Sequence, residues 1–204
     1  IVVRGASKKP CYIHVENEKA EILSADELWR QGVFSTEKKL REKYGKQIGV
    51  LSIGRAGEGL IKYANVISQE GRAGGRPGMG AVMGSKNLKA IAMRGTRDIK
   101  VARLDDFMEY VKEFHERMKG PATQKYRALG TPENVLVHNS LSCMPTRNFN
   151  NSRFEGAEKV SGENLNEKYV ARIIGCSSCA MRCEHMCVVS EGPYKNTMTR
   201  MEYE

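Results

Sequence analysis

The chain has 204 residues, of which 40% are hydrophobic and 28% charged, and its formal net charge is +9. This is ordinary globular composition, sufficient for one large hydrophobic core or two small ones. The sequence has no apolar run of membrane-spanning length and no signal peptide, which argues against a membrane or secreted protein. The positive charge favours an anionic cofactor, a nucleic acid or an acidic protein as partner. Because the chain opens on Ile1 without an initiator Met, we expect it to be a piece of a longer protein.

The first hundred residues predict a β-rich region. Residues 11–15 alternate, and Asn17-Glu18 is a suitable turn before the short β-rich run 20–23, so a hairpin is predicted here. Helices are predicted over 24–29, with Ser24 as N-cap, and over 36–44, ended by Gly45. Further strands are expected over residues 1–4, 47–53, 60–68 and 88–94.

The chain is organised around a glycine-rich stretch, Gly71 to Lys89, with the sequence GRAGGRPGMGAVMGSKNLK. Such glycine density allows a close approach to the backbone, and the stretch contains no carboxylate. Backbone N–H groups together with guanidinium groups make an anion site, most naturally for phosphate. The cations that stand around the glycines are Arg72, Arg76, Lys86 and Lys89.

This stretch fits neither the P-loop pattern nor a clean G-x-G-x-x-G, so it is not an ordinary ATP or NAD loop. A mobile glycine-rich linker is the alternative interpretation. The hydrophobic residues Met79, Val82 and Met83 favour packing instead.

After about residue 101 the pattern becomes mainly helical. Apolar residues at helical spacing predict a helix over 104–118, with Phe107 and Phe114 in the core, stopped by Gly120-Pro121. Shorter helices are expected over 123–129, 132–140 and 161–171, with a polar loop over 144–154. The fold class is therefore α+β, with a β-rich part over 1–100 and a mainly helical part over 101–204.

Four of the six cysteines crowd into twelve residues, and Cys176, Cys179 and Cys183 form a C-x2-C-x3-C motif. This spacing is typical of iron–sulfur ligands, with a fourth ligand remote in sequence. Zinc is the competing interpretation, because Cys187 and His185 could complete a local tetrahedral site. A disulfide framework would normally spread its cysteines, so a reducing cytosol is the better interpretation.

The loop GRAGGRPGMGAVMGSKNLKA and the later CSSCAMRC together resemble the tungsten-containing aldehyde ferredoxin oxidoreductase family. The stretches IGRAGEGLIKYA and IAMRGT also look like that family. The resemblance covers most of the chain, which is similar to the later part of the family's β-rich first domain and the start of its helical second domain. The family's chains are much longer.

The resemblance implies a tungsten-bispterin cofactor whose phosphates share Mg²⁺, and a [4Fe–4S] cluster. It assigns contacts with the pterin and its phosphate to Arg72, Ala73, Gly75 and Arg76, which makes 1–100 a partial tungstopterin-binding domain. It assigns three cluster ligands to Cys176, Cys179 and Cys183, with the fourth far downstream and Cys187 a bystander. Glu202, in the sequence Met201-Glu202-Tyr203-Glu204, is the candidate for orienting substrate or moving protons.

The implied activity is oxidation of a small aldehyde to a carboxylic acid, with electrons passed through the cluster to ferredoxin in an anaerobic cytoplasm. The implied partners are ferredoxin and either a second copy or a redox subunit, without nucleic acid or membrane. The alternatives are a tungsten subunit of a related reductase, such as benzoyl-coenzyme A reductase, and a basic zinc-binding nucleic-acid module.

Overall fold

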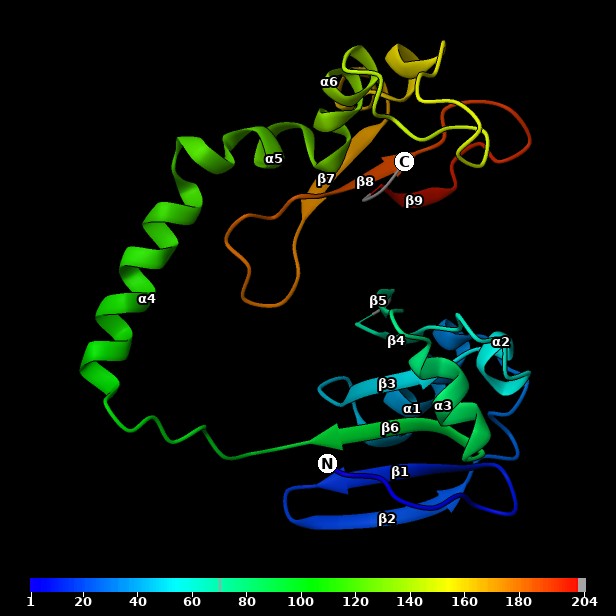
Figure 1. Ribbon diagram of the computed structural model, residues 1–204. Helices are drawn as coiled ribbons and strands as arrows, with labels where there is room; N and C mark the ends of the chain where they lie inside the picture. The colour runs from blue at the N-terminus through cyan, green and yellow to red at the C-terminus, as the bar shows by residue number, and fades with distance from the viewer. Residues whose placement is uncertain (70, 202–204) are drawn as a thin grey trace. The chain divides into compact units, whose positions relative to one another are not determined.

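The computed structural model describes residues 1–69 and 71–201, which divide into two compact units between Lys100 and Val101. The first unit is built on a mixed sheet of six strands, and the second combines helices with a three-stranded sheet (Figure 1). The expected α+β fold class, with the β-rich part first, is confirmed.

The strands of the first unit lie in the order β2-β1-β6-β3-β4-β5. Strands β1 and β6 are parallel, and the other neighbouring pairs are antiparallel. The strands are β1 (Cys11–Glu16), β2 (Lys19–Ser24), β3 (Gly49–Ile53), β4 (Val66–Ser68), β5 (Arg72–Gly74) and β6 (Leu88–Arg94).

Two hydrophobic clusters cover the two faces of this sheet. Helix α1 (Val33–Tyr44) places Leu40 in a cluster with Val50 and Ala90. On the other face, Met83 of helix α3 (Met79–Ser85) packs with Ile53 and Leu88. The four-residue helix α2 (Arg55–Glu58) follows β3 directly and lies against α3. The glycine-rich stretch is therefore part of a packed layer.

Several elements of the first unit follow the sequence prediction. The hairpin turns at Asn17, which has a positive φ of 54°, and β6 spans the predicted residues 88–94. Three predictions are wrong. Residues 1–4 are not a strand. In place of the helix over 24–29, Ser24 ends β2 and hydrogen-bonds with Asp26, where a turn over residues 26–30 begins. Most of 60–68 bends, because Leu60 has a φ of 59°, so only β4 remains extended.

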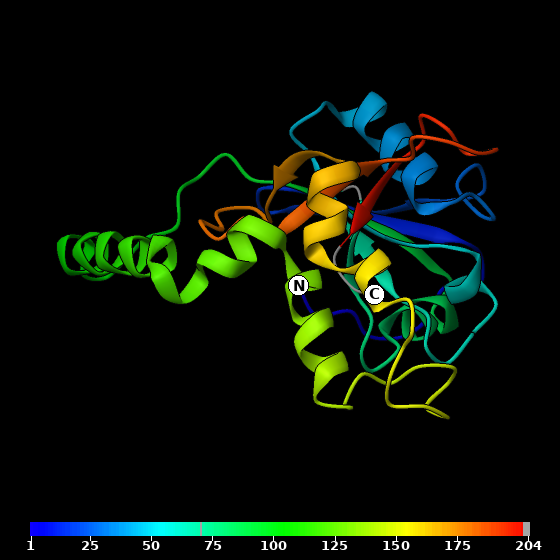
Figure 2. The same cartoon turned by 90° about the horizontal axis from the view of Figure 1, so that it is seen from above.

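The second unit begins with the long helix α4 (Leu104–Lys119), which extends away from the other elements of its unit (Figure 2). Its sheet has the antiparallel order β7-β8-β9. The remaining elements are η1 (Pro121–Thr123), α5 (Gln124–Leu129), η2 (Thr131–Glu133), α6 (Asn134–Ser140), η3 (Ala157–Val160), α7 (Gly162–Lys168), β7 (Val170–Ile174), β8 (Glu184–Val188) and β9 (Met198–Met201).

The prediction for the helix over 161–171 is correct at its start and wrong at its end. The Ser161 side chain caps α7 by accepting a hydrogen bond from the backbone N–H of Asn164 at 3.3 Å. The helix stops at Lys168, and Val170 already pairs with Cys187 in the sheet. Pairing with β8 therefore overrides the helical pattern at residues 170 and 171.

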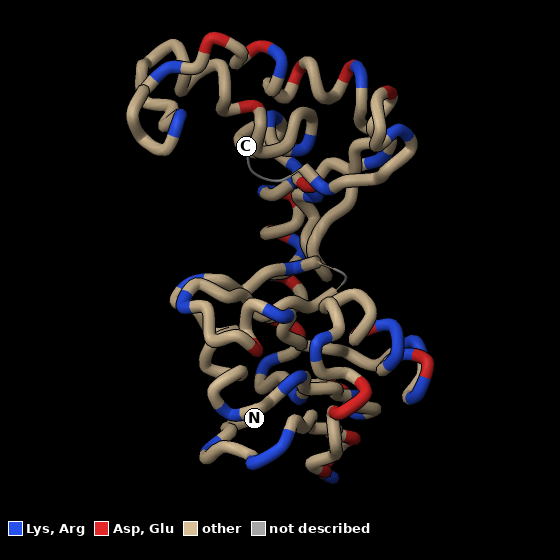
Figure 3. Tube along the Cα trace, turned by 90° about the vertical axis from the view of Figure 1, so that its right-hand side faces the viewer, with Lys and Arg blue, Asp and Glu red and all other residues tan. Residues whose placement is uncertain are grey.

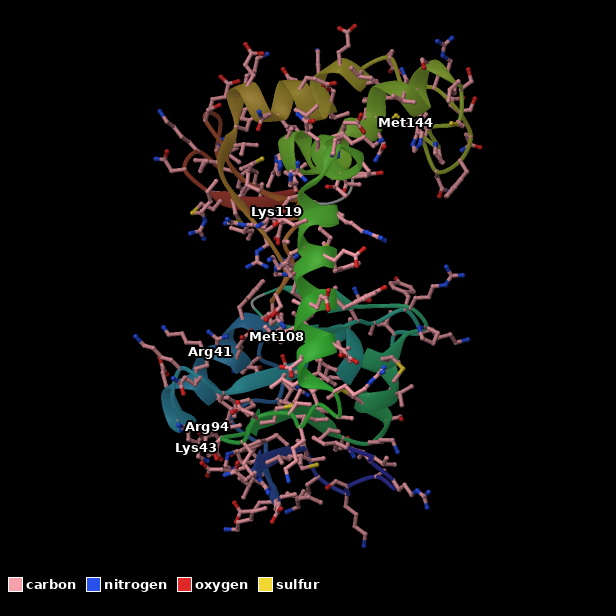
Figure 4. All side chains as sticks on the ribbon, turned by 90° about the vertical axis from the view of Figure 1, so that its left-hand side faces the viewer. Arg41, Lys43, Arg94, Met108, Lys119 and Met144 are labelled. Atoms are coloured by element: carbon pink, nitrogen blue, oxygen red, sulfur yellow. The ribbon has the colours of Figure 1, made fainter. Side chains whose placement is uncertain are left out.

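The expectation that Phe107 and Phe114 lie in the core is also wrong for the described part of the chain. Their exposed fractions are 49% and 53%, and no described residue of α4 is buried. Figure 4 shows side chains of α4 projecting around the helix between the labelled Met108 and Lys119. The amphipathic pattern predicted the helix correctly, although the described residues do not cover its apolar face.

Charge is interspersed along both units, where basic and acidic residues alternate over short distances (Figure 3). The carboxylate-free stretch 71–89 is an exception in the sequence. Among the described residues, no helix combines the length and the apolar character needed to cross a membrane.

Candidate cofactor loop and cysteine cluster

The candidate cofactor loop starts on the last strand of the six-stranded sheet. Arg72 and Ala73 belong to β5, which pairs with β4 on one side, and Gly75 and Arg76 follow it. The outer side of a terminal strand leaves backbone N–H and C=O groups open to a ligand. Ala73 and Arg76 are exposed, and Arg72 and Gly75 are half-buried. The segment thus combines the backbone of a terminal strand with two arginines, of which Arg76 is the more exposed.

Three glycines of this segment are required by the protein's own backbone. A Cβ atom on Gly78 would lie 1.9 Å from the carbonyl oxygen of Lys62, and Gly78 has a φ of 86°. A Cβ on Gly80 would lie 2.5 Å from the carbonyl oxygen of Asn65. One on Gly84 would lie 1.9 Å from the carbonyl oxygen of Gly57 in α2. The loop is therefore held in place by close packing against the protein's own backbone.

Gly75 is also in a tight position, because its Cβ would lie 2.5 Å from the Asn65 side-chain oxygen. A Cβ on Gly74 would lie 3.1 Å from the Val66 side chain, a close contact that a small shift of that side chain could relieve. Gly74, Gly75 and Gly78 therefore all occupy positions where a side chain would be crowded. Their position against a ligand stays a prediction.

Two of the four cations expected at the anion site are directed elsewhere. Lys86 donates to the carbonyl oxygen of Gly5 at 2.9 Å. Lys89 is fully buried, and its ammonium lies 2.5 Å from the carboxylate of Glu58. Burial lowers the pKa of Lys89, and Glu58 opposes that effect. Of the four predicted cations, Arg72 and Arg76 therefore stay candidates for the anion site. Sequence reasoning missed Glu58, since nothing in the pattern links residues 31 positions apart.

The cysteine motif lies on the loop that connects β7 to β8 and projects beyond their sheet (Figure 1). The backbone N–H of Cys179 donates to the carbonyl oxygen of Cys176 at 3.1 Å, which closes a turn over the C-x2-C pair. Ser178 and Arg182 have positive φ angles of 59° and 52°, so the loop reverses twice. The Arg182 guanidinium donates to the carbonyl oxygen of Ile173 at 3.1 Å and ties the loop to β7.

The three cysteines of the motif form no disulfide, with Cys176 exposed and Cys179 and Cys183 half-buried. Cys176 and Cys179 line a pocket of about 1060 Å³ together with Phe107 and Phe114 of α4. Within residues 1–69 and 71–201, no group of three or more His, Cys, Asp or Glu side chains is gathered closely enough to hold a metal ion. The donor set suits an iron–sulfur cluster chemically, although the thiols are not preassembled around a centre.

Cys187 and His185, which could complete a local zinc site, both lie buried on β8, the central strand of the three-stranded sheet. Burial raises the pKa of the Cys187 thiol and lowers the pKa of His185. Because no three donor side chains gather among the described residues, the local zinc site gains no support from this placement.

The second unit also contains a buried carboxylate that the sequence analysis did not single out. Glu184, directly after Cys183, lies 3.3 Å from the guanidinium of Arg200 on β9. Glu184 is 2% exposed, and this pairing joins β8 to β9 at the base of the cysteine loop. The candidate Glu202 lies outside the described residues.

Comparison with known proteins identifies the family. The N-terminal domain of aldehyde ferredoxin oxidoreductase matches residues 1–95, and its domains 2 and 3 match residues 109–204. The tungsten-containing aldehyde ferredoxin oxidoreductase of Pyrococcus abyssi is 40% identical over 189 residues, which are 90% of this chain and 31% of the relative. That of Thermococcus kodakarensis is 38% identical over 204 residues, 95% of this chain and 33% of the relative.

A solved structure is also similar, the active site complex BamBC of benzoyl coenzyme A reductase in complex with 1,5 dienoyl-CoA. Its TM-score is 0.70 at 26% identity, over 98% of this chain and 32% of that chain. The chain spans about one third of the length of the relatives it matches. With both family regions matched in order, on either side of the division between the two units, the chain belongs to the aldehyde ferredoxin oxidoreductase family.

Proposed function

We propose that this chain is the part of a tungsten-dependent aldehyde:ferredoxin oxidoreductase that binds the pterin phosphates and supplies three ligands of a [4Fe–4S] cluster. One observation carries the proposal. A single chain holds both a glycine loop with two arginines, which begins on the terminal strand β5, and a C-x2-C-x3-C loop whose cysteines form no disulfide.

In the first unit, Arg72 and Arg76 compensate the negative charge that remains on the phosphates after Mg²⁺ binds. Guanidinium groups suit phosphate oxygens because they can donate two parallel hydrogen bonds. Ala73 and Gly75 keep side chains small where the pterin approaches the backbone. When bound, the tungsten-bispterin supplies the two-electron oxidation of an aldehyde to a carboxylic acid, and the cluster passes electrons on singly.

In the second unit, Cys176, Cys179 and Cys183 hold three irons as thiolates. Metal sites are seldom preformed without their metal, so an ungathered loop is compatible with a ligand set that closes on binding. The turn at Cys176 and Cys179 already brings two of the ligand positions onto one loop reversal. We infer that the fourth ligand comes from outside this chain, as the family resemblance implies, with Cys187 buried on the central strand β8.

Glu202 is our candidate for orienting the substrate or moving its proton. The proposed partners are ferredoxin and a second copy of the protein or a redox subunit, in the cytoplasm. The proposal includes no contact with nucleic acid or a membrane.

A tungsten subunit of a benzoyl-coenzyme A reductase is the second candidate, favoured by the fold similarity over 98% of this chain. A subunit named aliphatic sulfonate oxidoreductase, WOR-like, from Pyrococcus furiosus is 26% identical over 215 residues. The same cofactor loop and cysteine loop would serve either reaction, so the substrate must be tested directly.

The test is anaerobic purification of the full-length protein from cells supplied with tungstate, followed by metal and pterin analysis. We expect tungsten, pterin, four irons per cluster, a brown colour and dye reduction with small aldehydes. Reduction or oxidation of the coenzyme A thioester instead of aldehydes would select the second candidate. A colourless zinc protein without tungsten would refute both.

A further inference from the structure

We propose that Lys89 and Glu58 are positioning residues that hold the cofactor loop in its binding conformation. The inference deepens the proposed function and rests on it for the identity of the ligand. Neither residue touches the proposed ligand. They act through helix α2, which carries Glu58 and whose Gly57 packs directly against Gly80 and Gly84 of the loop.

The ammonium of Lys89 has all three of its donor positions occupied. It donates to the carbonyl oxygen of Gln31 at 2.8 Å, to that of Ile53 at 2.7 Å and to the Glu58 carboxylate at 2.5 Å. A lysine ammonium has three N–H donors. Lys89 therefore has no donor left for a phosphate, and its charge is neutralised inside the protein.

The Glu58 carboxylate is also engaged from two sides. Both of its oxygens accept from the backbone N–H of Arg30 at 3.0 Å, while one of them meets Lys89. The neighbouring Arg55 donates from its Nε to the carbonyl oxygen of Arg30 at 2.8 Å. Helix α2 is thus tied at both ends to the turn around residues 30 and 31, and through Lys89 to strand β6.

The position of α2 decides where the cofactor loop can lie. A Cβ on Gly57 would meet the carbonyl oxygen of Gly80 at 2.8 Å, and one on Gly84 would meet that of Gly57 at 1.9 Å. Backbone contacts without intervening side chains leave little room for adjustment. A displacement of α2 would therefore move the start of α3 and with it Arg76, two residues before Gly78.

The first unit contains a matched control in the ion pair of Glu37 and Arg41. The two nitrogen–oxygen distances are similar, 2.8 Å for Arg41–Glu37 and 2.5 Å for Lys89–Glu58. The side chains of Glu37 and Glu58 are equally buried, with 6% exposed in each case. The control pair lies on α1, whose Leu40 packs against the face of the sheet opposite Met83 of α3.

The experiment compares Glu58→Gln with Glu37→Gln in the full-length protein. Two readouts are made on folded material, hydrogen exchange of residues 75–84 and tungsten and pterin content after gel filtration. We expect Glu58→Gln to raise hydrogen exchange in this segment and to lower cofactor retention roughly 10- to 100-fold. A loss of this size, roughly 10- to 100-fold, is typical when a residue that orients a metal ligand is mutated. Glu37→Gln should lower the melting temperature without either effect. Should Glu58→Gln not fold, the variants Glu58→Asp and Glu37→Asp are compared instead. Aspartate keeps the negative charge, but its shorter side chain no longer reaches the partner cation.

Unchanged exchange over 75–84 in the Glu58 variant would overturn the positioning role. Equal cofactor loss in the Glu37 variant would also overturn it, because the loss would then follow stability alone. Absence of tungsten from the wild-type protein would refute the proposed function, while the exchange data would still decide whether the ion pair positions the loop.

Discussion

The glycine loop and the cysteine loop differ in how far the fold fixes them before their proposed ligands bind. The glycine loop is fixed by its own fold, since Gly78, Gly80 and Gly84 pack against carbonyl oxygens of residues 57–65. The cysteine loop is anchored at its two ends by β7 and β8, and its thiols are not gathered. An organic cofactor with phosphates needs a surface of defined shape before it binds. A metal cluster can organise its own ligands, so its loop needs only the right residues and enough freedom.

The strongest test of this difference between the two loops is to disturb the packing of the glycine loop. Gly84→Ala places a methyl group 1.9 Å from the carbonyl oxygen of Gly57, so α2 and α3 must separate. We expect a loss of roughly 3 kcal/mol in the free energy of unfolding, at the upper end for overpacking. Gly95→Ala is the control, because nothing lies within 4 Å of its added Cβ. Urea denaturation of both variants of the full-length protein measures the difference, and equal midpoints would contradict the preformed loop.

The cysteine loop should respond to mutation in its cofactor content and hardly in its fold. Single changes of Cys176, Cys179 or Cys183 to Ser are expected to lose the cluster or alter its signal, with a change in stability of the apoprotein within about 0.5 kcal/mol, since these side chains are not buried. Iron analysis and electron paramagnetic resonance of the reduced protein provide the measurement. Cys187→Ser is expected to keep the cluster, and its loss there would favour a local four-cysteine site.

The charge of the glycine loop can be tested separately from its shape. The double change Arg72→Ala and Arg76→Ala removes both guanidinium groups of the proposed phosphate site and should lower pterin retention about tenfold or more, since charge-assisted hydrogen bonds contribute roughly 1.5–3 kcal/mol each. Melting temperature should change little. Normal tungsten and pterin content in this variant would show that backbone groups alone retain the cofactor.

The smallest expected effect concerns the pH dependence of the buried thiol on β8. The folded-state pKa of Cys187 is raised by burial, so the folded protein keeps this proton to higher pH than the unfolded chain. Its contribution to stability is present below the ordinary thiol pKa, about 8.5, and is lost as the pH rises through the raised value. Urea midpoints at pH 8 and pH 10 should fall further for the wild type than for Cys187→Ala. Parallel curves for the two proteins would contradict this.

What could be predicted from the sequence depended on how local the cause was. The β1–β2 hairpin and β6 were predictable because alternation and turn residues act over a few positions. The glycine density correctly indicated close approach to the backbone, although for Gly78, Gly80 and Gly84 the approaching group is the protein's own chain. Strands β7–β9 were missed, since their short segments become strands only by pairing with one another. The roles of Lys89 and Glu58 arise from a contact across 31 residues that no pattern encodes.

The outer side of β5, which pairs with no strand among the described residues, also bears on self-association. An unpaired strand edge is a template for self-association between chains. Strand β5 is three residues long, carries Arg72 and ends in Gly74. Shortness, positive charge and weak β-propensity each oppose the addition of a strand from another copy. These features disfavour the addition of a strand from another copy at the edge where we propose that the pterin binds.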